Sequence, residues 1–137
     1  MRYGNSTEHT RAMHRDILIY GANGYTAELV IARAVAAGAT PVLAGRTEAK
    51  LRPLAERFGL ALRVFPVDDP KVVAKNLAGI AVVLNCAGPF VRTAGGMAAG
   101  CIRAGAHYLD ITGEIDVFEA LAALDTEFRE WASKVAP

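Results

Sequence analysis

The sequence predicts an α/β fold of the Rossmann type, a doubly wound parallel sheet of about five strands flanked by helices. Short apolar runs typical of buried strands alternate with stretches in which apolar residues recur every three or four positions. A glycine-rich turn follows the first of these runs. The chain has 137 residues, 53% of them hydrophobic, which suits one compact domain and is too short for two of ordinary size.

The strands are expected where short apolar runs are bounded by glycine, proline or polar residues. The run Ile17–Tyr20 is rich in β-branched residues and ends at a glycine, and 80–84 is the most apolar run in the chain. Such runs suit strands that are buried on both faces. The expected strands are 17–20, 41–44, 62–67, 80–84 and 107–110.

The helices are expected where apolar residues recur at three- and four-residue steps. Thr47 is a plausible N-cap for the second helix, and Asp69 followed by proline favours the start of the third. Pro53 should bend or shorten the second helix because it removes one backbone hydrogen bond. The expected helical segments are 27–35 (closing at Gly38), 51–58, 70–77, 97–104 and 117–131.

Composition and charge argue against several classes of function. Fifteen Lys and Arg residues against fourteen Asp and Glu leave a net charge of +1, so no large field favours nucleic acid or an anionic membrane. The longest uncharged stretch, 76–91, contains glycine, asparagine and proline and does not suit a membrane span. Cys86 and Cys101 make no CxxC pair and suggest reduced thiols in a cytoplasmic setting. The histidines do not cluster at zinc-ligand spacings, so no metal is expected.

The turn after the first strand carries a binding motif. Gly21, Gly24 and Ala27 form a G-x-x-G-x-x-A pattern between an expected strand and an expected helix. Gly21 permits a tight turn, Gly24 lets the backbone approach a pyrophosphate, and Ala27 lets helix and strand pack closely. The free amides of the first helical turn then receive the phosphates, and the hydroxyls of Tyr25 and Thr26 can add to them. The motif predicts a nucleotide site, and a glycine turn without a ligand is the alternative.

The end of the second strand indicates which dinucleotide is bound. No acidic residue occurs between Glu28 and Glu48, whereas an NAD enzyme usually carries one there to accept from the ribose 2′-hydroxyl. Arg46 stands at that place and can pair with a 2′-phosphate or stack on adenine. Thr47 can donate a hydroxyl, and Lys50 lies one helical turn away. We therefore expect NADP rather than NAD, and a solvated loop charge at Arg46 is the alternative.

Three further loops leave their assignments open. Asp68 could accept from the adenine amino group or cap the next helix, for which Asp69 is the better candidate. Cys86 is expected to be a small buried thiol, because no histidine or cation lies near it in sequence. Asp110 and Glu114 could orient a substrate amine or a ribose, or they could cap the last helix. No catalytic residue is identified.

The small residues at 85–90 would let backbone lie along the cofactor diphosphate and the nicotinamide ribose, with Phe90 near the nicotinamide. Four ordered motifs, at 17–26, 43–46, 85–90 and 107–114, resemble the saccharopine dehydrogenase-like oxidoreductases, which include the trans-acting enoyl reductases. The resemblance implies an NADP site formed by the glycine loop, Arg46 and segment 85–90. The expected cofactor-binding residues are Gly21, Asn23, Gly24, Tyr25, Thr26, Arg46, Thr47, Asp68, Asn85, Ala87, Gly88, Pro89 and Phe90.

Members of that family continue into a sixth Rossmann strand and a separate α+β substrate domain, whereas this chain ends at Pro137. We therefore expect an NADP-binding domain at 16–137, behind a flexible tail at 1–15, that lacks its substrate domain. By the resemblance, the parent enzyme moves hydride to or from NADP, and this fragment binds cofactor without turnover. The bare sheet edge predicts self-association into a homo-oligomer.

Two alternatives differ in class. A short-chain dehydrogenase or reductase is disfavoured, because no tyrosine is followed by a lysine four positions later. A noncatalytic NADP-sensing module that acts through a protein partner fits the cofactor positions nearly as well. A fold of this type that binds nothing is a third interpretation.

Overall fold

One parallel sheet organises residues 17–135, the part of the chain that this computed structural model describes. The expected tail at 1–15 lies outside the described residues. The strands are β1 (Ile17–Tyr20), β2 (Val42–Gly45), β3 (Leu62–Val64), β4 (Val82–Asn85) and β5 (His107–Asp110). The helices are α2 (Tyr25–Ala36), α3 (Glu48–Phe58), α4 (Pro70–Asn76), α5 (Phe90–Ala104) and α6 (Ile115–Val135).

The strand order is β3-β2-β1-β4-β5, and every neighbouring pair is parallel. The chain therefore moves outward from β1 to β3, returns to the other side of β1 and continues to β5. The order reverses between β1 and β4, where Tyr20 pairs in register with Asn85. In open α/β sheets the ligand crevice lies outside the carboxyl ends of the strands at this reversal. The predicted doubly wound fold is confirmed.

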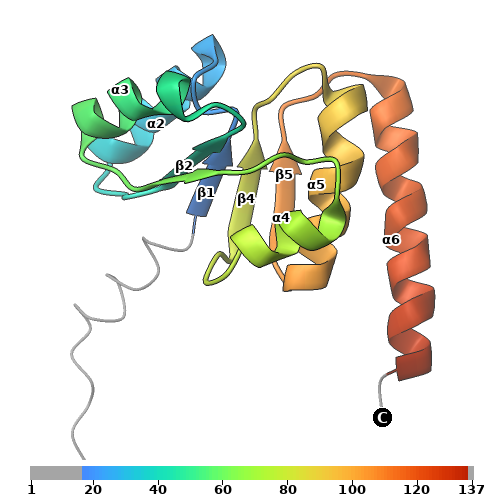
Figure 1. Cartoon of the computed structure of the whole chain (residues 1–137). Helices are drawn as coiled ribbons and strands as arrows, with labels where there is room; N and C mark the ends of the chain where they lie inside the picture. Colours follow the sequence, from blue (N-terminus) through green and yellow to red (C-terminus); the bar gives the residue numbers. More distant parts are fainter. Residues whose placement is uncertain (1–16, 136–137) are drawn as a thin grey trace, which may run out of the picture.

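Helices cover both faces of the sheet, so each central strand buries alternate residues on opposite sides. On one face, Ile19 of β1 and Leu43 of β2 pack in a cluster with Ile31 of α2 and Leu51 of α3. On the other face, Leu18 and Tyr20 belong to a second cluster that includes Val73 of α4 and Met97 of α5. Figure 1 shows α2 and α3 beside β1 and β2, α4 and α5 beside β4 and β5, and α6 along the outer side of α5.

Helix α5 begins at Phe90, so the expectation of a short helix at 97–104 is wrong. Its first two turns hold Thr93, Gly95 and Gly96, which interrupt the apolar period from which helices were predicted. Pro89 takes the N-cap position with φ of −74° and ψ of 132°. This extended conformation suits a residue that precedes a helix.

Helix α3 runs from Glu48 through Pro53 to Phe58, so of the bending or shortening expected from Pro53, the shortening does not occur. Pro53 is exposed, and the carbonyl that its missing N–H leaves open can be hydrated. Thr47 occupies the N-cap position of α3, but its side chain makes no capping hydrogen bond. The cap predicted for α4 is confirmed, since the Asp69 carboxylate accepts from the backbone N–H of Lys71 at 2.9 Å.

Three strands differ in extent from the sequence prediction. The second runs over Val42–Gly45 rather than 41–44. The third ends at Val64 rather than at 67, because its partner β2 ends at Gly45, whose carbonyl accepts the last ladder bond from the Phe65 amide. The fourth starts at Val82 rather than at 80, because the Ile80 amide closes a turn on the carbonyl of Leu77. Within 17–135, no helix combines the length and the hydropathy that a bilayer span needs.

Glycines let α5 approach α4 and the loop before it. A Cβ built on Gly96 would lie 1.9 Å from the carbonyl oxygen of Val67, and one on Gly100 would lie 2.3 Å from the side chain of Val73. Gly95, next to Gly96 in the same helix, has open space at its Cβ position. The close approach therefore depends on Gly96 and Gly100 and not on every glycine of the helix.

The substitution Gly96→Ala should lower the free energy of unfolding by about 1–3 kcal/mol, the usual cost of overpacking a close contact. The neighbouring Gly95→Ala should raise it by about 0.5–1 kcal/mol, because alanine is the better helix former and meets no atom. Urea denaturation of both variants measures the difference. Equal changes at the two positions would contradict the packing described for α5.

Candidate functional site

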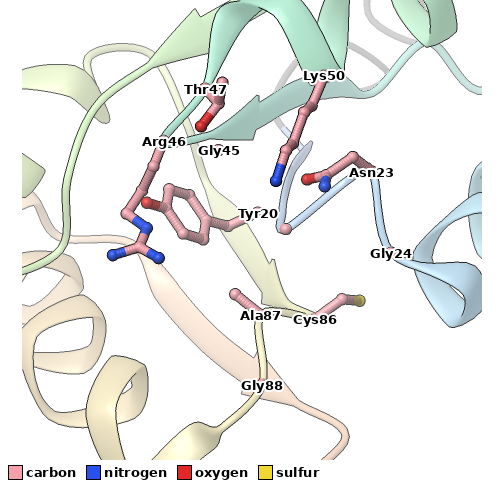
Figure 2. A pocket seen from close by; sticks show the side chains of 11 residues that line it. Tyr20, Asn23, Gly24, Gly45, Arg46, Thr47, Lys50, Cys86, Ala87 and Gly88 are labelled. Atoms are coloured by element: carbon pink, nitrogen blue, oxygen red, sulfur yellow. The ribbon is translucent and has the colours of Figure 1, made fainter.

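A cavity of about 230 Å³ opens at the carboxyl ends of β1, β2 and β4 (Figure 2). Its wall combines the turn after β1, the β2–α3 connection with the first turn of α3, and the loop after β4. These segments are far apart in the chain and meet because the sheet order reverses here. The lining residues are Tyr20, Gly21, Asn23, Gly24, Gly45, Arg46, Thr47, Lys50, Cys86, Ala87 and Gly88.

Gly21 forms the tightest point of this wall. Its φ is +74°, its amide donates to the carbonyl of Ala44 at 2.9 Å, and its carbonyl accepts from the amide of Gly24 at 3.0 Å. A Cβ at this position would lie 2.7 Å from the amide nitrogen of Ala87. Glycine is therefore required twice here, by the left-handed backbone conformation and by the approach of the loop after β4.

Helix α2 points an uncapped amino terminus at the cavity. Gly24 is its N-cap and makes no side-chain cap hydrogen bond. The first intrahelical bond runs from the Glu28 amide to the Gly24 carbonyl at 3.0 Å. The amides that precede Glu28 in the first turn therefore lack helical acceptors. Such amides, together with the helix dipole, bind phosphate groups.

Two cations stand on either side of the cavity. Figure 2 shows the guanidinium of Arg46 beside the ring of Tyr20 and the amino group of Lys50 extended toward Asn23. The ion pairs in the described part of the chain involve Arg52, Arg57 and Arg129, and neither Arg46 nor Lys50 has a carboxylate partner there. Both cations are exposed and can bind an anionic ligand.

Tyr20 forms the floor of the cavity and was missed in the sequence. Its hydroxyl donates to the carbonyl of Phe65 at 2.7 Å, and the two rings lie 5.1 Å apart between centroids. The pKa of Tyr20 is raised to about 12, mainly because the phenol is buried; the charge of Arg46 lowers this pKa and the charge of Asp68 raises it. The phenol is therefore neutral and structural at neutral pH. The sequence contained a signal for Tyr20, because it is a polar aromatic residue that ends an aliphatic strand next to a glycine turn.

Six of the expected cofactor residues do not line this cavity, although all of them follow a strand or end one at the same edge of the sheet. Tyr25 is 81% exposed on the surface of α2, and Pro89 and Phe90 begin α5. The six are Tyr25, Thr26, Asp68, Asn85, Pro89 and Phe90. Asp68 is exposed, and its neighbour Asp69 supplies the cap of α4.

Asn85 does not line the cavity and is fully buried at the end of β4. Its amide nitrogen donates to the hydroxyls of Thr93 and Tyr108, each at 3.1 Å, and its side-chain oxygen accepts from the Ala87 amide at 3.0 Å. The side chain is thus engaged within the protein. Asp110 is similarly engaged, because it accepts from the Tyr108 hydroxyl at 2.8 Å.

Two remaining residue types bear on the chemistry of the cavity. Cys86 is half-buried, and burial raises the pKa of its thiol, so it is not a thiolate at neutral pH. Among residues 17–135, His, Cys, Asp and Glu side chains form no cluster of three or more that could hold a metal ion. The cavity therefore offers amides and cations for binding and lacks an activated nucleophile in this part of the chain.

A strand order that reverses beside a glycine turn, with a helix amino terminus behind the turn, is the arrangement of Rossmann-type dinucleotide-binding domains, and this chain is one of them. Its family is narrower than that class. The model of the saccharopine dehydrogenase NADP binding domain matches residues 17–135, so the chain belongs to this family. NADP is the cofactor that this family of domains binds, and the resemblance found in the sequence is confirmed.

Curated relatives carry the same domain within longer chains. The trans-acting enoyl reductase of Mycobacterium tuberculosis is 32% identical over 107 residues, which are 73% of this chain and 26% of the relative. A probable mitochondrial saccharopine dehydrogenase-like oxidoreductase of Arabidopsis thaliana is 29% identical over 124 residues, 79% of this chain and 27% of the relative. The chain thus spans about a quarter of the length of these relatives.

Solved structures share the fold at lower identity. Apo saccharopine dehydrogenase (L-Glu forming) from Saccharomyces cerevisiae has a TM-score of 0.65 and 24% identity, with 80% of this chain and 24% of that chain covered. The Citrobacter sp. triphenylmethane reductase complexed with NADP(H) has a TM-score of 0.69 and 21% identity, with 83% and 46% covered. These likenesses show the Rossmann-type fold.

The geometry at Gly21 makes a prediction about stability. Gly38 has φ of +87° with open space at its Cβ position, whereas Gly21 has φ of +74° and a crowded one. Gly38→Ala should cost about 1–2 kcal/mol from backbone strain alone. Gly21→Ala should cost about 1–3 kcal/mol more, because the added methyl meets Ala87. Urea denaturation tests this difference, and equal losses would show that the two loops do not touch as described.

Proposed function

We propose that this chain binds NADP across the cavity, with the diphosphate at the amino terminus of α2, as part of an oxidoreductase that transfers hydride to or from the cofactor. The observation that carries the proposal is the uncapped amino terminus of α2 behind Gly21, in a cavity with two cations that lack carboxylate partners among residues 17–135. Backbone amides bind a diphosphate without requiring a net charge on the protein. The formal net charge of +1 is consistent with binding by local geometry.

The residues present fit an NADP diphosphate and its phosphorylated adenosine. Gly21 and Gly24 expose backbone where a side chain would intrude. Arg46 and Thr47 follow β2, where the adenosine ribose lies in dinucleotide-binding domains, and no carboxylate of residues 17–135 lines the cavity. Arg46 pairs with the 2′-phosphate or stacks on adenine, and Lys50 adds a second cation from α3. Ala87 and Gly88 provide backbone along the rest of the dinucleotide.

We propose further that this chain alone binds cofactor without turnover. NADP, when bound, supplies or accepts the hydride, and the protein must orient a substrate and exchange a proton. Tyr20 and Cys86 both line the cavity, but Tyr20 donates its hydroxyl to the carbonyl of Phe65, and burial keeps the Cys86 thiol protonated. Neither is a suitable acid or base near neutral pH. The relatives are about four times as long as the matched region. This length supports a separate substrate domain in the whole enzyme, outside the matched region.

The surface around β5 supports assembly with further protein. Leu109, Ile111, Ile115 and Phe118 are large apolar side chains that are exposed on β5, the following loop and the start of α6. Exposed apolar side chains beside a sheet edge favour association. We propose that a substrate domain or a second copy of the chain covers them. The free thiols of Cys86 and Cys101 support a reducing, cytoplasmic setting.

A noncatalytic NADP-sensing module is the second candidate, and the internal hydrogen bond of Tyr20 and the protonated thiol of Cys86 favour it. In that case binding of NADP would alter a contact with a partner protein. The two candidates predict different activities for the longer protein that contains this domain. Hydride transfer by a full-length enzyme that contains this domain supports the first, and NADP binding without any turnover supports the second.

The substitution Arg46→Ala should weaken binding of NADPH by about 1.5–3 kcal/mol, the scale of a hydrogen bond to a charged group. Binding of NADH should change little, because it lacks the 2′-phosphate. Isothermal titration of the wild-type chain and the variant with both cofactors measures the effect.

Arg33→Ala is the matched control, because Arg33 is an exposed arginine in the last turn of α2 and does not line the cavity. It should leave binding of both cofactors unchanged. Equal losses of NADPH and NADH affinity in Arg46→Ala would contradict the proposed role in selecting NADP.

A further inference from the structure

Asn85 is the buried polar side chain of the described core, and its hydrogen bonds have a consistent direction. Its amide nitrogen donates to the hydroxyls of Thr93 and Tyr108. Each hydroxyl then donates onward, Thr93 to the carbonyl of Ala87 at 2.6 Å and Tyr108 to the carboxylate of Asp110 at 2.8 Å. Each hydroxyl donates its single hydrogen onward and therefore can only accept from Asn85. The network thus fixes the orientation of the Asn85 amide, with its nitrogen toward the two hydroxyls.

The first branch of this network holds Ala87 from both sides. The Ala87 amide donates to the side-chain oxygen of Asn85 at 3.0 Å, and its carbonyl accepts from Thr93. Ala87 is also the residue that Gly21 approaches so closely that a Cβ would lie 2.7 Å from its nitrogen. Side chains outside the cavity therefore set the separation between the glycine turn and the loop after β4.

The second branch reaches the loop after β5. Asp110, the register partner of Asn85 across β4 and β5, accepts from Tyr108 with one oxygen and from the Thr112 amide with the other, the latter at 3.1 Å. The Thr112 hydroxyl then accepts from the Glu114 amide at 3.1 Å, just before α6. Burial raises the pKa of Tyr108, and the charge of Asp110 raises it further, so its hydroxyl stays a donor near neutral pH.

We propose that Asn85 is a positioning residue and not a cofactor ligand. Through Thr93 it holds Ala87 at the glycine turn, and through Tyr108 and Asp110 it couples that position to residues 111–114 at the end of β5. The coupling rests on the proposed function only in that Ala87 lines the dinucleotide cavity. The loop at 111–114 follows β5 at the same edge of the sheet, and the hydrogen bonds through Tyr108 and Asp110 are the link by which a change in one loop reaches the other.

Amide hydrogen exchange by NMR on the chain without cofactor tests the coupling. Tyr108→Phe keeps the ring and removes only the hydroxyl between Asn85 and Asp110. Exchange of the Ala87 and Thr112 amides should accelerate together, by about tenfold, the scale of one lost hydrogen bond. Unchanged exchange at either amide would overturn the proposal, because the two loops would then be independent turns.

Substitutions of Thr93 test the first branch of the network separately from the second, because Thr93 hydrogen-bonds to Ala87 and not to Asp110. Thr93→Val should accelerate exchange at Ala87, and Thr93→Ser, which keeps the hydroxyl, should restore the wild-type rate. Thr126→Val is the control, because the Thr126 hydroxyl donates to the carbonyl of Ala122 on α6, away from both loops. It should leave Ala87 and Thr112 unchanged.

The core amides of Leu18 and Val83 distinguish positioning from general loss of stability, since both residues are fully buried. Equal acceleration at these amides in Tyr108→Phe would overturn the proposal. NADPH titration forms a separate arm, in which Tyr108→Phe should weaken binding about tenfold or less. A wild-type chain that binds no NADPH would contradict the proposed function, whereas the exchange rates without cofactor would still decide whether Asn85 couples the loops.

Discussion

The contact between the Gly21 backbone and the Ala87 peptide sets the geometry on which the site depends. It lies where the strand order reverses, so it joins the two halves of the sheet at their carboxyl edge. Gly21 turns the chain at φ of +74° and so directs α2 with its amino terminus toward the cavity. Side chains of β4 and α5 hold Ala87 on the other side. A larger residue at position 21 would alter the cavity and the helix direction together.

On the proposed account, cofactor binding in this domain depends on local charge rather than on the net charge of the chain. The formal net charge is +1, which is too small to attract an anionic cofactor from a distance. The described structure instead places Arg46 and Lys50 at the cavity without a carboxylate partner, near a helix terminus that carries partial positive charge. The cations are exposed and remain hydrated until a ligand arrives. Affinity should therefore fall with salt less steeply than for a protein with a large basic surface.

The sequence predicted the order of elements, the glycine turn and the choice of NADP, because each depends on short-range patterns. The period of apolar residues identified the strands, and the absence of an acid between Glu28 and Glu48 indicated the cofactor. It did not predict that α5 begins at Phe90, because Gly96 in the second turn of this helix matters through its close approach to Val67, a residue distant in sequence. The burial of Asn85 depends on neighbours from α5 and β5 in the same way.

The most direct test of the central claim is an amide NMR titration of the chain with NADPH. We expect the largest shifts at the amides of residues 22–27, with further shifts at Arg46, Ala87 and Gly88, because these line or face the cavity. Saturation of all these signals with one dissociation constant would support a single dinucleotide site at the glycine turn. Shifts confined to another surface, with residues 22–27 unmoved, would contradict the account.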